Sequence, residues 1–183
     1  ANSVTPANVE PHDFELSPKD VTKLSGAKMV VYVAGFQSSL DDAVKQVSGP
    51  TVVNLASSVK LEQRDDHDGD DHDHEAAASS SATEAAHDDH DHDHGSTDPH
   101  FWLDPQRMIK VAETLESSFA QVDPANANDY KAGLDKLKTA LTNLDTQYTK
   151  GLSSCQHNTF ITSNAAFGYL ADRYQLTQAS ISG

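Results

Sequence analysis

Residues 29–55, MVVYVAGFQSSLDDAVKQVSGPTVVNL, decide the fold class of this chain. They open with a continuous apolar, β-branched run at 29–33, which is typical of a strand covered on both faces. Residues 40–47 then have the pattern of a short helix, and residues 51–55 form a second apolar run. A strand, a helix and a strand in this order predict a parallel sheet in an α/β fold.

The flanking sequence predicts further helices and one more strand. Upstream, residues 17–26 carry the signals of a short helix, with serine as N-cap, proline in the first turn and glycine at the end. Downstream, apolar residues at helical spacing predict helices over 106–122 and 127–152. A strand is expected at 159–163, and a helix over 164–174 follows it.

The helix expected at 127–152 is longer than a small domain is wide, because about 1.5 Å per residue gives it a length close to 40 Å. Its apolar positions recur at intervals of four and three residues, and they are Tyr130, Leu134, Leu137, Leu141, Leu144 and Tyr148. We predict that it is a strut between two lobes. A bundle or coiled-coil helix is the alternative, and the strands on either side disfavour it.

The composition limits the possible partners. The chain has 183 residues and a formal net charge of -15, of which the tract 65–94 contributes -12. The remainder is close to neutral, which argues against a nucleic-acid partner. No run of about 18 apolar residues occurs, so we expect no membrane span. Cys155 is the single cysteine, and it is either a structural thiol or half of a bridge to another segment.

The tract 65–94 combines twelve acidic residues with seven histidines and has no lysine or arginine. The histidines are His67, His72, His74, His87, His90, His92 and His94. Imidazole is a common ligand for zinc and copper, so the composition indicates metal handling. The tract contains too few apolar residues to fold, so we expect a mobile loop over 60–97. The alternative is a charged spacer whose histidines have no role.

Two further histidines lie in non-repetitive sequence. His12 stands in the segment EPHDFE at 10–15, and His100 follows Asp98-Pro99. Ligands of open α/β sheets bind at the carboxyl ends of the strands, where such loops gather. Each histidine alone is more typical of a capping or surface residue, but together with the histidine-rich tract they indicate metal ligands.

Four segments in order carry a family resemblance: PHDFELSPKD at 11–20, AKMVVYVAGFQSSLDDAV at 27–44, DPHFWLDP at 98–105 and FITSNAAFGYLADRYQL at 160–176. With the histidine-rich loop between the second and third, the chain resembles the zinc-type (cluster A-I) solute-binding proteins of bacterial metal-uptake ABC transporters. The resemblance covers essentially the whole chain. It implies two Rossmann-like α/β lobes joined by one long helix, a chelatase-like fold, with the metal in the cleft between the lobes.

The resemblance also implies the ligands. His12 and His100 match two family ligands, and the third, expected as histidine in a pattern like TSHAAFGYL, is Asn164 here. Asparagine offers a neutral carbonyl oxygen, a poorer zinc donor than imidazole. Three explanations of an asparagine at this position stay open: an engineered loss of the ligand, a natural weakening of the site, or a changed coordination set with water in that place. His157 precedes the strand and is expected at its opposite end.

The implied organisation divides the chain into three parts. Residues 1–125 correspond to the N-terminal metal-binding lobe, 126–154 to the linking helix and 155–183 to the beginning of the C-terminal lobe. We expect the opening strand and helix of the first lobe to be absent, together with most of the second lobe and its carboxylate ligand.

We therefore expect a binding protein and not an enzyme. It would capture Zn²⁺ rather than Mn²⁺, which prefers carboxylate and water, and deliver it to an ABC-transporter membrane permease. We expect a monomer in the periplasm or on the outer face of the bacterial membrane, either free or lipid-anchored. The histidine-rich loop would recruit or sense zinc.

Other classes of function remain open from the sequence. The run from His90 to His94 superficially resembles a zinc hydrolase, but catalytic metal ligands must be held rigidly and a low-complexity loop does not hold them. A zinc storage or buffer protein, or an adhesion protein, would use the lobes only as a scaffold.

Overall fold

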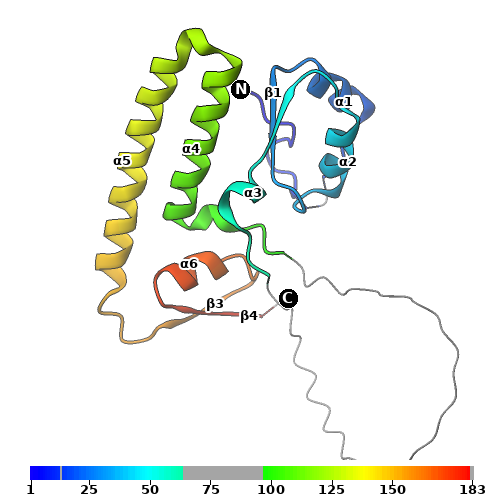
Figure 1. Cartoon of the computed structure of the whole chain (residues 1–183). Coiled ribbons are helices and arrows are strands. Elements are labelled where there is room, and N and C mark those ends of the chain that lie inside the picture. The colour runs from blue at the N-terminus through cyan, green and yellow to red at the C-terminus, as the bar shows by residue number, and fades with distance from the viewer. Residues whose placement is uncertain (13, 64–96, 182–183) are drawn as a thin grey trace, which may run out of the picture.

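The computed structural model describes residues 1–12, 14–63 and 97–181, so the seven histidines of the acidic tract lie outside the described residues. Figure 1 shows three groups of elements. A small sheet with α1 and α2 lies beside the long hairpin of α4 and α5, and a second small sheet with α6 lies at the foot of that hairpin.

The first sheet consists of β1 (Met29–Tyr32) and β2 (Thr51–Asn54), joined by α2 (Ser38–Gln46). The two strands pair in parallel, with Val30 opposite Val52, so the predicted strand–helix–strand unit is confirmed. The expectation that β1 is covered on both faces is wrong in part, because Val31 is 39% exposed. Its neighbour β2 is open to a similar degree at Val52, which is also 39% exposed. This sheet has two strands among the described residues, so it is narrow. The helices that pack on it leave part of each face exposed to solvent.

Helix α1 (Pro18–Ser25) begins where the sequence predicts. Ser17 and Asp20 form a reciprocal capping box, in which each side chain accepts from the other residue's backbone N–H. One face of the sheet packs against α1 and α2 through a buried cluster of Leu24, Val30, Leu40 and Ala43.

Helices α4 (Pro105–Val122) and α5 (Ala127–Leu152) form an antiparallel hairpin, connected through the single 3₁₀ turn Pro124–Asn126. Phe119 stacks on Tyr130 near the turn, with ring centroids 5.2 Å apart. No residue of α5 is buried in the described part of the chain. Helix α5 packs against α4 along most of its length, and near its end Tyr148 stacks on Tyr174, the residue after α6, with ring centroids 5.0 Å apart.

The second sheet pairs β3 (Thr159–Thr162) in parallel with β4 (Thr177–Ser180), and α6 (Gly168–Arg173) connects them. The sequence did not predict β4, because its residues are short and polar rather than apolar. Helix α6 begins at Gly168 and not at 164, because the preceding turn is held by Gln178 of β4, whose side-chain oxygen accepts from the N–H of Phe167 at 2.9 Å.

The main core lies where the first sheet, α4 and α6 meet. The short helix α3 (Ala56–Val59) and the 3₁₀ turn η1 (Phe101–Leu103) contribute to it. Its buried members are Val53, Leu55, Val59, Phe101, Val111 and Tyr169.

Two expectations from composition concern residues that the structure describes. Cys155 is exposed and forms no disulfide with any other described residue. No described helix combines the length and the apolar character that crossing a membrane requires.

The buried carboxylate of Asp104 connects helix α4 with helix α6. It is 2% exposed and caps α4 by accepting from the N–H of Gln106 at 2.9 Å. Arg173 of α6 donates to both its oxygens, from Nε at 3.0 Å and from a terminal nitrogen at 2.8 Å. This paired geometry ties α6 to the first turn of α4.

We expect Asp104→Ala to lower the free energy of unfolding by about 2–4 kcal/mol, because it removes a helix cap and two charge-assisted hydrogen bonds at once. Urea denaturation measures the change. Asp135→Ala is the control, since Asp135 forms an exposed 3.6 Å pair with Lys131 and its loss should cost no more than about 0.5 kcal/mol. Equal effects of the two substitutions would contradict the role of Asp104.

The hairpin should respond to acid through Glu113 of α4. Its pKa lies below the ordinary value of 4.5, chiefly because Lys138 of α5 donates to it at 2.8 Å and then because of Lys110. The contribution to stability is thus present above the unfolded value and lost as the pH falls through the lowered pKa. We expect Glu113→Gln to unfold at lower urea than the parent chain at about pH 7, with the difference shrinking as the pH falls below 4.5 and Glu113 is protonated.

Lys138→Met, which removes the other partner, should reproduce this pattern. A difference between parent and variant that stays constant with pH would show that the pair does not act through its charge.

Candidate metal centre

His12 lies between the start of the chain and α1, in a segment held on both sides. The side-chain amide of Gln37, which is 7% exposed, donates to the carbonyl of Pro11 at 2.7 Å. The hydroxyl of Ser39 donates to the carbonyl of Phe14 at 2.8 Å. Both donors stand at the start of α2, so the first helix of the α/β unit positions the residues before and after His12.

The ring of His12 packs edge-on against Phe36, with centroids 4.7 Å apart. Phe36 follows β1, in the loop before α2. His12 therefore lies at the carboxyl end of the strand, which is the edge where an α/β sheet binds its ligands.

His100 is oriented by a neighbouring carboxylate. Asp98 Oδ1 accepts from the backbone N–H of His100 at 2.9 Å and lies 2.7 Å from its ring Nδ1. An ionised carboxylate only accepts hydrogen bonds, so the hydrogen of the neutral ring is on Nδ1 and Nε2 keeps its lone pair. This arrangement, carboxylate to Nδ1 and metal to Nε2, is the usual one for a metal-binding histidine.

The structure brings the two histidines together. The centroids of the His12 and His100 rings are 5.6 Å apart, with planes inclined by 52°. Trp102 lines the pair on one side, with its ring 5.2 Å from that of His100 and 5.5 Å from that of Phe36. Two imidazoles in contact with aromatic rings suit a borderline metal such as zinc better than one that prefers oxygen.

The pair by itself is not a complete coordination shell. Over the ranges 1–12, 14–63 and 97–181, no group of three or more His, Cys, Asp or Glu side chains is placed to hold a metal. Tetrahedral zinc takes four ligands, so two more donors are needed beside His12 and His100.

The other predicted positions lie in the second sheet region. Asn164 stands in the turn after β3, where its backbone carbonyl accepts from the Thr162 hydroxyl at 2.8 Å and from the Gln178 amide at 3.0 Å. His157 precedes β3 and lines an apolar hollow with Tyr148 and Phe160. The two residues are thus at opposite ends of β3.

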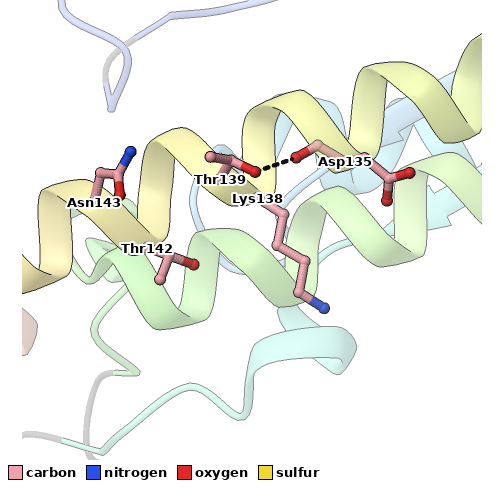
Figure 2. A pocket seen from close by; sticks show the side chains of 5 residues that line it. All are labelled: Asp135, Lys138, Thr139, Thr142 and Asn143. Atoms are coloured by element: carbon pink, nitrogen blue, oxygen red, sulfur yellow. Dashed lines mark hydrogen bonds between the residues drawn. The ribbon is translucent and has the colours of Figure 1, made fainter.

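A separate hollow on α5 does not compete with this site. Figure 2 shows its lining, which comes from that helix alone: Asp135, Lys138, Thr139, Thr142 and Asn143. Lys138 extends towards α4, where it pairs with Glu113, and the hydroxyl of Thr139 donates to the carbonyl of Asp135 at 2.9 Å. The hollow is lined by no imidazole, and Asp135, Lys138 and Thr139 already bond within the protein.

Three residues that support the histidines were missed in the sequence. Gln37 fixes the chain beside His12, Asp98 orients His100, and the Tyr169 hydroxyl bonds to the backbone of Asp98. A signal existed for Asp98, which stands two residues before a histidine, a spacing that allows such a bond. No local pattern identifies Gln37 or Tyr169, because their contacts join segments far apart in the chain.

Comparisons with known proteins all find relatives whose descriptions name zinc uptake or zinc binding. The family model described as "Zinc-uptake complex component A periplasmic" matches residues 1–183. The chain is 36% identical over 180 residues to a zinc-binding protein AdcA of Streptococcus pyogenes, covering 97% of the chain and 34% of that protein. It is 30% identical over 181 residues to the high-affinity zinc uptake system protein ZnuA of Bacillus subtilis, covering 97% and 52%.

The solved Zn(II)-bound ZnuA-like domain of Streptococcus pneumoniae AdcA matches with a TM-score of 0.76 and 26% identity, over 98% of this chain and 57% of that one. This likeness confirms the predicted α/β fold.

The chain spans about a third to a half of the length of these curated relatives. A component of an uptake complex is a transport protein and not an enzyme, as the sequence predicts. With a match over its whole length, the chain belongs to the family of the periplasmic zinc-uptake complex component A.

Proposed function

We propose that this chain binds Zn²⁺ outside the cytoplasmic membrane as part of a solute-binding protein, which delivers the ion to an ABC-transporter permease. The observation that carries the proposal is the His12–His100 pair at the carboxyl end of β1. Gln37 holds the segment of His12 through the carbonyl of Pro11, and Asp98 orients the ring of His100 and leaves its Nε2 available to a metal. The zinc named in the descriptions of the relatives supports the choice of ion.

The division into lobes follows from the same proposal. Residues 1–125 would supply His12 and His100, residues 126–154 would link the lobes, and residues 155–183 would begin the second lobe. Asn164 occupies the third-ligand position, after the strand that opens this lobe. Its amide oxygen, or a water in its place, would make the coordination weaker than a histidine would.

The acidic tract is proposed as an auxiliary element. Its seven histidines, at 67, 72, 74, 87, 90, 92 and 94, would recruit zinc weakly near the pair and raise the local concentration of the ion. Binding needs neutral imidazole, so it should weaken as the pH falls through about 6.5. A storage protein would hold most of its zinc in this tract, whereas a transport component keeps a separate, tighter site.

A zinc titration against a chelating dye tests the proposal on the chain with residues 64–96 replaced by a short Gly/Ser linker. This replacement keeps the bridge between Gln63 and Thr97 intact. We expect one site, whose affinity falls about 100-fold or more in His12→Ala and in His100→Ala, because each loses a direct ligand. His157→Ala, at the far end of β3, is the control and should bind as the parent does.

Zinc binding that is unchanged in both His12→Ala and His100→Ala would remove the histidine pair from the function. Zinc lost with the tract alone would favour the storage protein.

Restoring an imidazole at the third position should strengthen the site. We expect Asn164→His to raise the zinc affinity of the linker-replaced chain by roughly 10-fold or more, since imidazole is a better zinc donor than an amide oxygen. Asn158→His, which adds a histidine before β3 instead of after it, is the matched control. An equal gain in the two variants would show that the added imidazole acts at no particular place.

A further inference from the structure

Helix α6 reaches the segment that carries His100 through one buried side chain, Tyr169, which is 1% exposed. Its hydroxyl accepts from the N–H of Glu62 at 2.8 Å and donates to the carbonyl of Asp98 at 2.6 Å. Burial raises the pKa of this phenol, so the hydroxyl keeps its proton and remains a donor.

The two residues that Tyr169 joins, Glu62 and Asp98, also bond to each other through their other backbone groups. The N–H of Asp98 donates to the carbonyl of Glu62 at 2.9 Å, and the adjoining residues Gln63 and Thr97 form an antiparallel bridge. We call these four residues, Glu62, Gln63, Thr97 and Asp98, the junction. The chain passes through the junction immediately before and immediately after residues 64–96.

Helix α4 holds the junction from another side. The guanidinium of Arg107 lies over the ring of Tyr169, 4.6 Å from its centroid, and pairs with the carboxylate of Glu62. It also donates to the carbonyls of Val59 and Lys60, just upstream. The ring of Tyr169 is thus fixed by packing and by charge, and its hydroxyl is directed at the junction.

From the junction, one residue leads to the metal centre. The backbone of Asp98 is bonded to Tyr169, and its carboxylate is bonded to both the N–H and the ring Nδ1 of His100. We propose that Tyr169 is a positioning residue for His100, acting through Asp98, so that α6 sets the tautomer and the direction of a ligand on the segment before α4. The proposal rests on the proposed function only where it concerns zinc.

The first test reads the ring of His100 in the full chain without metal. Long-range ¹H–¹⁵N correlation spectra at about pH 8 distinguish the two neutral tautomers of imidazole. The signals of His100 are identified by their loss in His100→Gln. We expect the Nδ1–H form in the parent chain, a loss of that form in Asp98→Ala, its retention in Asp98→Asn, which keeps an oxygen acceptor, and a smaller share of it in Tyr169→Phe.

The second test is the zinc titration. Tyr169→Phe deletes one oxygen and leaves the ring in the core, and we expect zinc affinity to fall about 10-fold, compared with 10- to 100-fold for Asp98→Ala. Tyr130→Phe is the matched control, because its hydroxyl bonds to Asp123 at 2.7 Å at the opposite end of the hairpin. Its zinc affinity should stay within about twofold of that of the parent.

The outcomes separate the two proposals. If Tyr169→Phe lowers only the midpoint of unfolding and leaves the tautomer and the zinc affinity unchanged, its role is structural and the positioning proposal is overturned. If the parent chain binds no zinc through His100, the proposed function fails, while the tautomer measurement still decides whether Tyr169 positions the ring.

Discussion

The arrangement of this chain depends on the buried carboxylate of Asp104, which is shared between two helices. It caps α4 and is held by two of the three guanidinium nitrogens of Arg173, so the beginning of one helix and the end of another meet at a single charged group. A buried charge is tolerated only when it is paired and hydrogen-bonded, and here both requirements are met at once. The core around Phe101 and Tyr169 can close because this charge is neutralised beside it.

The two histidines of the proposed metal centre are attached independently to this frame. His12 comes from a segment without regular structure, and the start of α2 holds it through Gln37 and Ser39. His100 comes from the turn before α4, and Asp98 directs its ring. Two histidines held by separate elements are brought together only when both parts of the fold are formed, so the proposed metal site depends on the native packing of the chain.

The elements with a strong local pattern were predictable from the sequence, and those held by distant contacts were not. The apolar runs at β1 and β2, the capping residues of α1 and the heptad-like spacing of α5 each carry their own signal. β4 is polar, and distant contacts hold it: it pairs with β3, and the Gln178 side chain bonds to the turn of Asn164. His12 and His100 were recognisable as candidate ligands because histidine is a residue type that commonly binds metals. Gln37 and Tyr169 gave no such signal, because their contacts are with residues 26 and 71 positions away in the chain.

The bridge between Gln63 and Thr97 has a consequence for how the family can vary. Because Gln63 and Thr97 pair side by side, the two points at which the sequence 64–96 joins the described fold are close together. The entropy of closing a flexible segment rises slowly with length, by about 0.6 kcal/mol for each doubling. Changes in the number of residues between Gln63 and Thr97 should therefore cost the fold little free energy.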